Sequence, residues 1–538
     1  MTDIEIPIGK RTVKYRFFEM VPAVLSVSLV LLPIILSLVS PIVATVFIIA
    51  YLIMWFVKAI GIAYRTIQGY YFLDKAKKTN WHQRLADLED PAAALTTMAS
   101  RQSEWRSQDH FNNLQKMSQR PAGYFKPSQF YNAVIVALYN ESADIVDPTI
   151  EAIFASNYDM KRLILIIGYE ARGPKRCHTL AKELVKKYGS RCFYAAAVEH
   201  PEDIPNEVVG KGANITCAGT FLQTFLKQQH IADENVLVTT LDSDNRPHPE
   251  YLACAAYQYI TDLDRNRRAY QPIALYINNI WDAPAPMRVL ATGNSFWTII
   301  DSMRPHTLRN FAAHAQGMAS LRRTNLWSVR TVVEDGHQYW RSWFAFDGHY
   351  EVTPIYVPIY QDAVLAETYR KTIKAQFFQL RRWAYGASDI AYMADKGMRK
   401  GRTVPFWGFW ARFLRLVDNH VSRAASPLII TFGGWIPVIN ADAQHSIVAN
   451  ELPQIASQLQ FVAMFGLFIT VFLTFKMLPP RPERYKRRRN VGMLVQWLFM
   501  PLTSICFGAA AAFNSQFRLF LGKYLDKFDV TDKAVIKN

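Results

Sequence analysis

Long apolar runs occupy both ends of this chain, and a mixed pattern of apolar and polar positions fills its middle. Near the N-terminus, residues 20–39 are uncharged, Ser40 and Pro41 interrupt the pattern, and a second apolar run extends from residue 42 to residue 64. Each run has about the 20 residues that a helix needs to cross roughly 30 Å of hydrocarbon. Two long runs without a small-residue cleavage site argue against a cleaved signal peptide. We therefore expect an N-terminal transmembrane hairpin over residues 1–64.

Further candidate crossings lie in the C-terminal part. Residues 461–475 form a clear apolar run, residues 491–513 form another that Pro501 interrupts, and residues 426–438 form a short one. These lengths are typical of membrane-spanning or re-entrant segments. We therefore assign residues 403–538 to an interfacial helix and a C-terminal transmembrane region.

The distribution of Lys and Arg between the runs predicts their orientation. Residues 476–489 are dense in Lys and Arg, whereas residues 440–460 contain neither. The positive-inside rule places the first of these loops in the cytoplasm and the second outside, and it also places the N-terminal tail and the long middle in the cytoplasm. We therefore expect a multi-pass protein of the cell membrane with a cytosolic central domain.

The topology of the last apolar run stays open between two arrangements. A single crossing leaves Lys523, Lys527 and Lys533 outside the cell. A re-entrant pair of segments, bent at Pro501, returns them to the cytoplasm.

Residues 405–421 predict a different kind of helix, with one apolar face. Its apolar stripe consists of Phe406, Phe409, Trp410, Phe413, Leu416 and Val417. Arg412, Arg415 and Asp418 lie on other faces. This pattern is typical of a helix that lies in the membrane surface. The alternative is an amphipathic helix that packs on a protein core.

The middle of the chain alternates between buried-strand and helical patterns. The predicted strands cover residues 131–138, 161–168, 192–198 and 236–241, and the predicted helices cover residues 147–155, 179–188 and 212–229. Alternation of this kind predicts an open, doubly wound α/β sheet. We assign residues 131–402 to this domain and residues 65–130 to a linking insertion. In such sheets, ligands bind at the carboxyl ends of the strands.

Composition narrows the class of protein without identifying it. Half of the 538 residues are hydrophobic and the formal net charge is +17, which suits anionic partners such as phospholipid head groups or nucleotides. Many basic residues flank the apolar runs, so positive-inside placement explains the charge and we expect no nucleic-acid partner. The cysteines show no metal-binding spacing, and they indicate reduced thiols in a cytosol-facing protein. They are Cys177, Cys192, Cys217, Cys254 and Cys506.

Two carboxylates, Asp242 and Asp244, follow the last predicted strand. Residues two apart in a strand point the same way, so both carboxylates can face one point. Unpaired, they would repel, and one would take up a proton. A Mg²⁺ or Mn²⁺ ion with oxygen ligands removes the repulsion and keeps positions open for phosphate oxygens. The alternative is a cap for the following Asn-Arg-Pro turn.

Two more motifs contain reactive groups. Residues 331–333 form a short apolar stretch, predicted as a strand, that runs into Glu334 and Asp335, and an acidic residue at a strand end is a candidate general base. The alternative is a solvated turn. Residues 376–383 read QFFQLRRW, which on a helix places an amide, a guanidinium and an indole on one face. Such a face can hold pyrophosphate and stack on a sugar. An interfacial helix with a snorkelling Arg is its alternative.

Together and in this order, the motifs resemble those of the membrane-bound family 2 glycosyltransferases, which include the cellulose and hyaluronan synthases. The matching segments are ALYNE (137–141), KGANI (211–215), LDSD (241–244), VEDG (333–336) and QLRRW (379–383). The last matches the family's Gln-x-x-Arg-Trp motif, the most specific of the set. The resemblance covers roughly residues 131–385 and the flanking membrane segments. It implies a GT-A-type cytosolic domain flanked by transmembrane helices.

The resemblance also implies roles for residues on the donor side. It implies that Tyr139 and Glu141 lie beside the nucleoside and that Lys211 approaches the nucleotide or its phosphates. It makes Asp244 the direct ligand of a Mg²⁺ or Mn²⁺ ion, with Asp242 nearer the donor.

On the acceptor side, the resemblance makes Asp335 the catalytic base. It implies that Gln379, Arg382 and Trp383 contact the diphosphate and frame the acceptor end, with Trp383 on the acceptor itself. One departure concerns the second strand, which usually ends in an Asp-Asp-Gly-Ser-like turn that grips the base or ribose. Glu170 stands in that place, so the identity of the nucleotide stays open. The usual Pro before the Tyr-Asn-Glu turn is also replaced, by leucine.

These implications predict an inverting, metal-dependent glycosyltransferase that uses a nucleotide-sugar donor, preferentially a UDP-sugar, at the membrane. The expected acceptor is a growing polysaccharide or glycan. Transfer of a single sugar to a lipid-linked acceptor is an alternative. An alternative of another class is a non-catalytic membrane scaffold with a nucleotide-binding fold, and a transporter is disfavoured because the clear spans contain no charged residue. Membrane lipids are the other expected partners.

Overall fold

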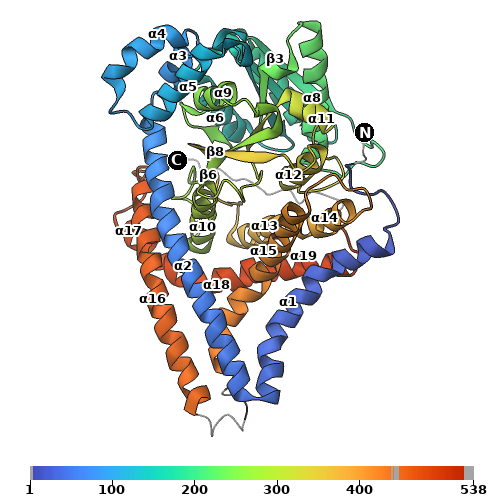
Figure 1. Ribbon diagram of the computed structural model, residues 1–538, viewed down its shortest axis with the longest axis vertical. Coiled ribbons are helices and arrows are strands. Elements are labelled where there is room, and N and C mark those ends of the chain that lie inside the picture. Colours follow the sequence, from blue (N-terminus) through green and yellow to red (C-terminus); the bar gives the residue numbers. More distant parts are fainter. Residues whose placement is uncertain (1–3, 438–439, 441–446, 526–538) are drawn as a thin grey trace.

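One mixed β-sheet forms the centre of the molecule (Figure 1). The computed structural model describes residues 4–437, 440 and 447–525. Within them, eight strands form the sheet in the order β3-β2-β1-β4-β7-β6-β8-β5. The strands are β1 (Tyr131–Leu138), β2 (Leu163–Glu170), β3 (Tyr194–His200), β4 (Val236–Asp242), β5 (Arg246–Pro247), β6 (Arg268–Tyr276), β7 (His314–Gly317) and β8 (Glu351–Gln361).

The strand directions bring several carboxyl ends to one edge of the sheet. β1 pairs in parallel with β2 and β4, and β2 pairs in parallel with β3. β7 is antiparallel to both β4 and β6, so the two reversals cancel and β6 runs in the direction of β4. β8 is parallel to β6. The loops that follow β1, β2, β4, β6 and β8 therefore emerge at the same edge, where ligands bind in α/β folds.

Helices cover both faces of the parallel part of the sheet. In β1, Val134 and Val136 pack against α6 (Ala143–Phe154), α7 (Lys175–Tyr188) and α9 (Tyr251–Thr261). Ala133 and Ile135, which point the opposite way, pack against α8 (Lys211–Gln228) and α11 (Met318–Arg323). Side chains alternate across a strand, and a strand that is buried on both faces reads as a continuous apolar run. The predicted α/β fold class, with apolar helices flanking the sheet domain, is confirmed.

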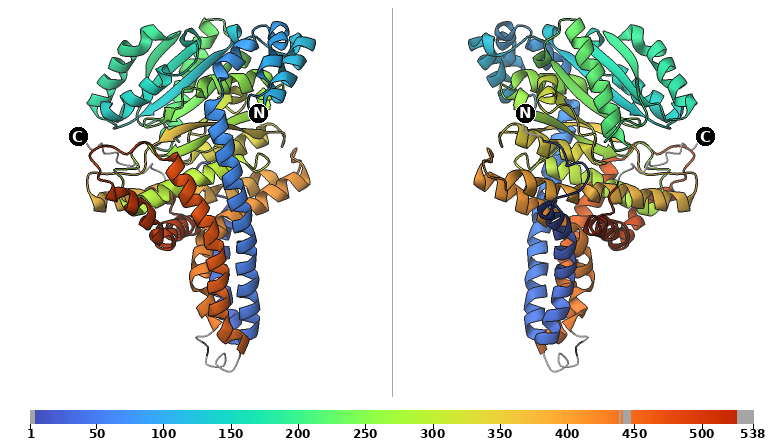
Figure 2. Two further views of the ribbon diagram at one scale, coloured as in Figure 1. Left: turned by 90° about the vertical axis from the view of Figure 1, so that its left-hand side faces the viewer. Right: turned by 90° about the vertical axis from the view of Figure 1, so that its right-hand side faces the viewer.

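A second layer of helices lies between the sheet and the long helices below it, as Figures 1 and 2 show. It contains α10 (Ala285–Ser302), α12 (Glu334–Ala345), α13 (Tyr369–Ala384) and α14 (Asp389–Gly397). Thr298 Oγ1 donates a 2.9 Å hydrogen bond to Ala274 O and so attaches α10 to β6. This layer carries the Gln-x-x-Arg-Trp segment directly beneath the carboxyl edge of the sheet.

Four helical segments among the described residues are long and apolar enough to cross a membrane. They are α1 (Val13–Val39), α2 (Pro41–Lys78), Asn450–Met477 within α16 (Ile447–Met477), and the run Arg488–Phe520. The last run comprises α17 (Arg488–Val495), α18 (Met500–Thr503) and α19 (Ala510–Phe520), joined by the 3₁₀-helix η12 (Gln496–Phe499) and the π-helix η13 (Ser504–Ala509). The expected break at Ser40 and Pro41 separates α1 from α2. Lys527 and Lys533 lie outside the described residues.

The linking insertion is helical, and its start is continuous with the membrane hairpin. α2 extends to Lys78, so the expected boundary at residue 64 falls inside a helix. The insertion adds α3 (Trp81–Asp87), α4 (Pro91–Thr97) and α5 (Ser107–Gln119). Trp81 N donates to the buried Glu250 at 2.7 Å, which attaches the insertion to the start of α9. The insertion thereby holds α2 against the sheet domain.

The amphipathic helix expected at residues 405–421 packs part of its apolar stripe on protein, and its position relative to the membrane surface stays a prediction. It is the first part of α15 (Phe406–Phe432). Phe409, Phe413 and Leu416 are buried in a core cluster with residues of α12 and α14. The alternative of a helix packed on a protein core accounts for these three residues, whereas Phe406 of the same stripe is 46% exposed. The short apolar run from residue 426 continues α15 to Phe432, and Val438, at its expected end, lies outside the described residues.

Candidate active site

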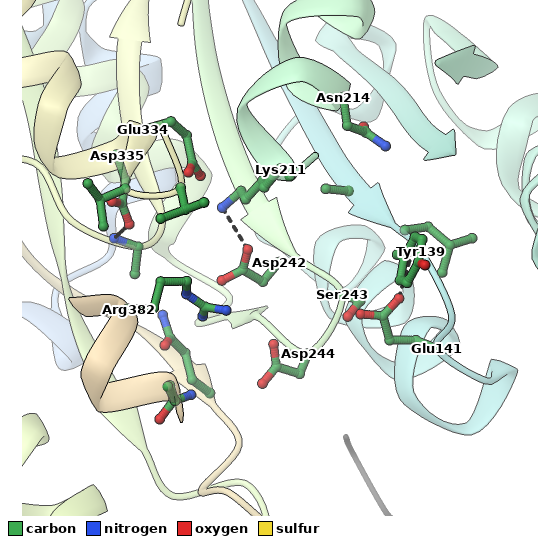
Figure 3. A pocket seen from close by; sticks show the side chains of 18 of the residues that line it. Tyr139, Glu141, Lys211, Asn214, Asp242, Ser243, Asp244, Glu334, Asp335 and Arg382 are labelled. Carbon is green, nitrogen blue, oxygen red and sulfur yellow. Dashed lines mark hydrogen bonds and ion pairs between the residues drawn. The ribbon is translucent and has the colours of Figure 1, made fainter. Parts of the chain in front are cut away.

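A cavity of about 180 Å³ opens at the carboxyl edge of the sheet, between the strand ends and α13. Figure 3 shows Tyr139 and Glu141 on the opposite side of this cavity from Glu334 and Asp335, with Lys211 and Asp242 between them. All ten residues singled out from the sequence line the cavity: Tyr139, Glu141, Glu170, Lys211, Asp242, Asp244, Asp335, Gln379, Arg382 and Trp383. Residues from Tyr139 to Trp383, on separate segments of the chain, are thus brought together, although their individual roles stay predictions.

Lys211 and Asp242 form an ion pair in the middle of the cavity. Lys211 Nζ lies 2.6 Å from Asp242 Oδ1. Burial lowers the pKa of Lys211, but the neighbouring carboxylates of Asp242 and Glu334 outweigh this effect and raise it above its usual value. The lysine is therefore positively charged at neutral pH. Lys211 is the first residue of α8, so the positive end of the helix dipole adds to its charge.

A glycine permits α8 to start this close to the acidic motif. A Cβ on Gly212 would lie 2.4 Å from Ser328 O and 3.0 Å from Glu334 Cβ. Both separations are shorter than non-bonded atoms tolerate, so a side chain at residue 212 would push the helix away from Glu334. The sequence motif KGANI contains this glycine for a steric reason that only the packed structure reveals.

Asp244 is fixed in the loop after β4 by the chain that follows β8. Its Oδ2 accepts a hydrogen bond from Asp362 N at 3.2 Å, and its carbonyl accepts one from Asn278 Nδ2 at 3.1 Å. Among the described residues, no group of three or more His, Cys, Asp or Glu side chains forms a metal site by itself. Two carboxylates on one loop still fit a hard Mg²⁺ or Mn²⁺ ion that takes its remaining oxygen ligands from phosphate and water. Asp242 is paired with Lys211, and the expectation that Asp244 is the direct metal ligand stays a prediction.

The acidic pair Glu334 and Asp335 begins a helix, which corrects the expectation of a strand end. Residues 331–333 have no strand partner, and α12 starts at Glu334. A three-residue apolar stretch is too short for periodicity to distinguish a strand from an extended helix lead-in. Asp335 Oδ2 accepts a hydrogen bond from Ala312 N at 2.7 Å, and its Oδ1 accepts one from Gly336 N at 2.7 Å. These two donors orient the carboxylate.

Glu334 differs from its neighbour because it is almost fully buried. Burial raises its pKa to about 8, and the charge of Asp335 adds to the shift while Lys211 opposes it. His314, on the adjacent strand β7, has its pKa lowered to about 4 by burial. Its Nδ1 lies 3.2 Å from Ala312 O. Burial therefore favours the protonated form of Glu334 and the neutral form of His314.

The loop after β1 is held by a carboxylate that folds back on its own turn. Glu141 Oε2 accepts hydrogen bonds from Tyr139 N at 2.9 Å and from Asn140 N at 3.1 Å. This arrangement positions the Tyr139 ring at the wall of the cavity. Side chains of Asn, Asp and Glu that bond to nearby backbone N–H groups are a common way to fix such turns.

Glu170, at the end of β2, is engaged by two basic neighbours. Arg172 Nε donates to Glu170 Oε2 at 2.6 Å, and His200 Nδ1 lies 3.2 Å from the same oxygen. Burial raises the pKa of Glu170, but the contacts with His200 and Arg172 outweigh it and lower the pKa. His200 Nε2 lies 3.0 Å from Glu207. Glu170 is therefore an anion within a network, and its exposed edge lines the cavity.

α13 supplies the lower wall of the cavity. Gln379, Arg382 and Trp383 share the helix face predicted from their spacing and line the cavity together. The rings of Trp383 and Tyr276 lie 6.1 Å apart between centroids, in a tilted arrangement. Tyr276 is buried, and burial together with Asp242 and Asp244 raises its pKa. Indole and phenol faces beside a guanidinium suit a sugar next to a diphosphate.

Sequence reasoning missed several residues of the cavity wall. Tyr276 and Gln361 are the last residues of β6 and β8, and Asp362 follows directly. No motif marks them, because their position depends on the direction of β6 and β8 relative to β4. Asn214 was within the KGANI segment but was given no role. Tyr276, Gln361 and Asp362 could have been found by expecting the carboxyl end of every parallel strand to contribute to the site.

No family model matches the sequence, and no curated protein matches it. Several solved structures are similar in fold. One is the mannosyltransferase PcManGT from Pyrobaculum calidifontis in complex with GDP-Man and Mn²⁺, with 16% identity, a TM-score of 0.43, and coverage of 81% of this chain and 100% of that chain. Another is S. aureus TarS 1–349 in complex with UDP, with 10% identity, a TM-score of 0.34, and coverage of 75% and 95%.

A third is glucosyl-3-phosphoglycerate synthase from Mycobacterium tuberculosis in complex with Mn²⁺, UDP and phosphoglyceric acid. It shares 13% identity and a TM-score of 0.29, and the match covers 54% of this chain and 84% of that chain. Because every one of these TM-scores is below 0.5, the similarities assign no activity to this chain.

Proposed function

We propose that this chain is a membrane-bound, inverting glycosyltransferase of the family 2 type. It transfers a hexose from a nucleoside diphosphate sugar to a glycan acceptor. Its catalytic domain faces the cytosol, on the side that the positive-inside rule assigns to the Arg-rich loop at residues 476–489.

The observation that carries the proposal is the convergence of five separate sequence motifs on one cavity. Asp335, Asp244 and Arg382 come from α12, from the loop after β4 and from α13, and all three line that cavity. A sugar transfer needs a base, a metal-binding carboxylate and a cation for the leaving diphosphate. The convergence supports this reaction because the three chemical functions lie around a single space.

Asp335 is the proposed general base. Its carboxylate would accept the proton of an acceptor hydroxyl while that oxygen attacks the anomeric carbon of the donor. The bond between the anomeric carbon and the diphosphate oxygen breaks on the opposite face, so the configuration at that carbon inverts. The hydrogen bonds from Ala312 N and Gly336 N hold the carboxylate in one orientation for this step.

The leaving nucleoside diphosphate gains negative charge, and cations of this chain offset it. Lys211 and Arg382 both line the cavity, and Lys211 is pre-positioned by its ion pair with Asp242. Asp244, with Asp242 beside it, would hold the Mg²⁺ or Mn²⁺ ion, which supplies further positive charge to the diphosphate. Positive groups fixed before the reaction stabilise the developing charge without reorganisation.

Tyr139 and Glu141 are proposed to contact the nucleoside, with Glu170 at its far edge. Their separation from Asp335, on the opposite side of the cavity in Figure 3, supports an arrangement with the nucleoside and the acceptor at opposite ends of the donor. Trp383 and Gln379 would frame the acceptor. A non-catalytic scaffold would not need a base that is oriented by two backbone donors.

The test is a donor screen with the full chain purified in an uncharged detergent. Each member of a nucleotide-sugar panel, with UDP-sugars first, is incubated with and without Mn²⁺, and release of nucleoside diphosphate is measured. We expect one or a few donors to be consumed, and only when a divalent cation is present. Donor binding without any turnover, across the panel and with glycan acceptors added, would favour the scaffold instead.

A further inference from the structure

The N-terminal segment of the chain packs against the elements that hold the acidic pair Glu334 and Asp335. We call residues 4–6, which read Ile-Glu-Ile, the N-terminal strap. Figure 1 shows the dark blue N-terminal segment beside α12 and α14, before it enters α1. The strap is continuous with α1, a candidate membrane span, and α12 begins at Glu334. Contacts of the strap therefore join a candidate membrane helix to the helix of the proposed base.

A buried ion pair attaches the strap to α12. Glu5 pairs with Arg341, whose side chain is fully buried, and the side chain of Glu5 is 18% exposed. Burial lowers the pKa of Arg341, and the carboxylate of Glu5 opposes that effect. Within the described residues, Glu5 is the one carboxylate that forms an ion pair with Arg341. Removal of one partner from a buried pair leaves an uncompensated charge, so Arg341 depends on the strap.

Hydrogen bonds and an apolar contact hold the rest of the strap. Ile6 O accepts a hydrogen bond from Arg330 Nη1 at 2.8 Å, and Ile4 O accepts one from the Tyr392 hydroxyl of α14 at 2.7 Å. The side chain of Ile6 is buried in the apolar cluster that contains Trp340 of α12. The strap is therefore fixed on α12, on α14 and on the loop between α11 and α12.

Arg341 holds a turn whose backbone conformation is unfavourable by itself. Asn325 and Leu326 have φ angles of 54° and 61°, in the left-handed region that a leucine rarely adopts. Arg341 Nη2 donates a hydrogen bond to Thr324 O at 2.8 Å, and its Nη1 donates one to Leu326 O at 2.7 Å. One guanidinium thus bonds to both ends of the turn. Because Glu5 balances the charge of that guanidinium, the strap supports the turn through Arg341.

The residues from this turn to the start of α12, 324–333, form what we call the connecting segment, and its first half packs on α8. Ser328 is held from two sides. Its Oγ donates a hydrogen bond to the strap carboxylate at 2.8 Å, and its carbonyl lies where a Cβ on Gly212 would lie. Thr216 Oγ1 of α8 donates a hydrogen bond to Trp327 O at 3.1 Å. The connecting segment therefore lies between the strap and the first turns of α8.

The end of the connecting segment forms part of the cavity wall. Val332 and Val333 line the cavity, and Asp335 follows two residues later in the first turn of α12. Val208 N donates a hydrogen bond to Val329 O at 2.7 Å, which joins the connecting segment to the loop before α8. The position of Asp335 relative to α8 therefore depends on how firmly this segment is held.

We propose that Glu5 is a positioning residue for sugar transfer. By pairing with Arg341 and Ser328, it holds the connecting segment against α8 and thereby sets the position of Asp335 in the cavity. This role rests on the proposed function, because it concerns the step in which Asp335 is the base. Glu5 is not one of the described residues that line the cavity, so its effect on the reaction passes through α12 and the connecting segment.

A positioning role and a role in stability alone predict different results. A reacting group that is misplaced by about 1 Å can lower a rate by about a hundredfold. A strap that only stabilised the fold would lower the melting temperature and leave the rate for each folded molecule unchanged. The experiment therefore measures the transfer rate, the donor affinity and the local mobility of the connecting segment separately.

The test compares the full wild-type chain with Glu5→Gln, both in an uncharged detergent. Hydrogen–deuterium exchange is measured without donor or acceptor, and kcat is measured at saturating donor. We expect the amides of residues 324–341 to exchange about tenfold faster in Glu5→Gln, while the amides of β1 are unchanged. We expect kcat to fall about tenfold or more. The affinity for the nucleoside diphosphate should change less than about threefold, because Lys211 keeps its ion pair with Asp242.

Glu183→Gln is the matched control, because it removes an exposed carboxylate on α7 of the sheet domain, and it should leave exchange and kcat unchanged. Glu5→Asp keeps the negative charge and is expected to retain more of the rate than Glu5→Gln. If Glu5→Gln does not fold, Tyr392→Phe replaces it. This variant loses the hydrogen bond to Ile4 O and is expected to lower kcat about twofold to tenfold.

Each outcome decides the proposal. A lower kcat together with faster exchange of residues 324–341 supports it. An unchanged kcat in the folded variant overturns it, and so does a lower kcat without any change in that exchange. A loss of donor affinity as large as the loss of kcat also overturns it, because the donor site is then disturbed instead of the base. No turnover of any donor by the wild-type chain overturns the proposed function and the role of Glu5 with it, whereas full turnover in Glu5→Gln overturns the role of Glu5 alone.

Discussion

Lys211 Nζ lies 2.6 Å from Asp242 Oδ1, so the first residue of α8 is paired with the last residue of β4 across the floor of the cavity. The pair gives Lys211 a fixed position before any donor binds. A diphosphate in the cavity would compete with Asp242 for the lysine. Donor binding would then release Asp242 toward the metal ion that Asp244 is proposed to hold.

Lys211→Gln is expected to weaken binding of the nucleotide donor about tenfold to a hundredfold, because a charge-assisted hydrogen bond to phosphate is lost. Isothermal titration with the nucleoside diphosphate measures the change. Lys227→Gln is the matched control, since Lys227 lies at the exposed end of the same helix. Equal affinities of the two variants would remove Lys211 from the donor site.

Asp335→Asn is expected to leave donor affinity nearly unchanged and to lower the rate of sugar transfer by about a hundredfold or more, because asparagine cannot accept the acceptor proton. Its amide can keep one of the two backbone hydrogen bonds, so the local fold should be retained. Donor binding and transfer are measured on the same preparation, with the exposed Asp264→Asn as control. Substantial turnover in the folded Asp335→Asn variant would mean that another group is the base.

Asp244→Ala is expected to abolish the dependence of nucleotide affinity on Mn²⁺, whereas the wild-type chain should bind the nucleotide more weakly once a chelator removes the metal. The reason is that Asp244 is the proposed direct metal ligand, and the one carboxylate that remains, Asp242, leaves the ion with too few oxygen ligands from the protein. Titrations with and without Mn²⁺ provide the measurement. A variant that responds to Mn²⁺ as strongly as the wild type would show that the metal is held elsewhere.

The buried strands were the most predictable part of the fold. Residues 131–138 form β1 as expected, and the strand expected at residues 236–241 is β4, one residue longer. Both are continuous apolar runs bounded by polar residues, a pattern that only a strand buried on both faces needs. The stretch at residues 331–333 was predicted as a strand and is not one. Three residues are too few for a hydrophobic periodicity to distinguish a strand from other structures.

Partners of an apolar face cannot be derived from its spacing. The stripe on α15 is the same whether membrane or protein covers it, and only the tertiary structure places Phe409 against α12 and α14. The cavity shows the same limit. Residues in motifs, such as Asp244 and Arg382, were predicted to line the cavity. Tyr276 and Asp362 line it because β6 and β8 run in the same direction as β4, and no local sequence pattern encodes that direction.

The thermal stability of the nucleotide-free chain is expected to fall as the pH rises toward 9, and Glu334→Gln is expected to reduce this loss. Burial raises the pKa of Glu334 from 4.5 to about 8, so the folded state holds its proton more tightly than the unfolded state. The resulting stabilisation is complete below about pH 4.5 and disappears as the pH rises through about 8. Melting temperatures between pH 5 and pH 9 give the comparison, with the exposed Glu351→Gln as control. Parallel curves for the wild type and Glu334→Gln would contradict the raised pKa.

Phe409→Ala is expected to lower the free energy of unfolding by about 3–5 kcal/mol, because it empties a buried site in the cluster between α12, α14 and α15. The fit at this site is close, since a Cβ on Gly397 would lie 2.0 Å from Phe409 Cε2. Trp407→Ala is the control, because that side chain is 80% exposed on the same helix. Unfolding in detergent by a chemical denaturant measures both variants. A stripe that faced lipid instead of protein would give Phe409→Ala no larger an effect than Trp407→Ala, so the difference between the two variants tests which surface α15 covers.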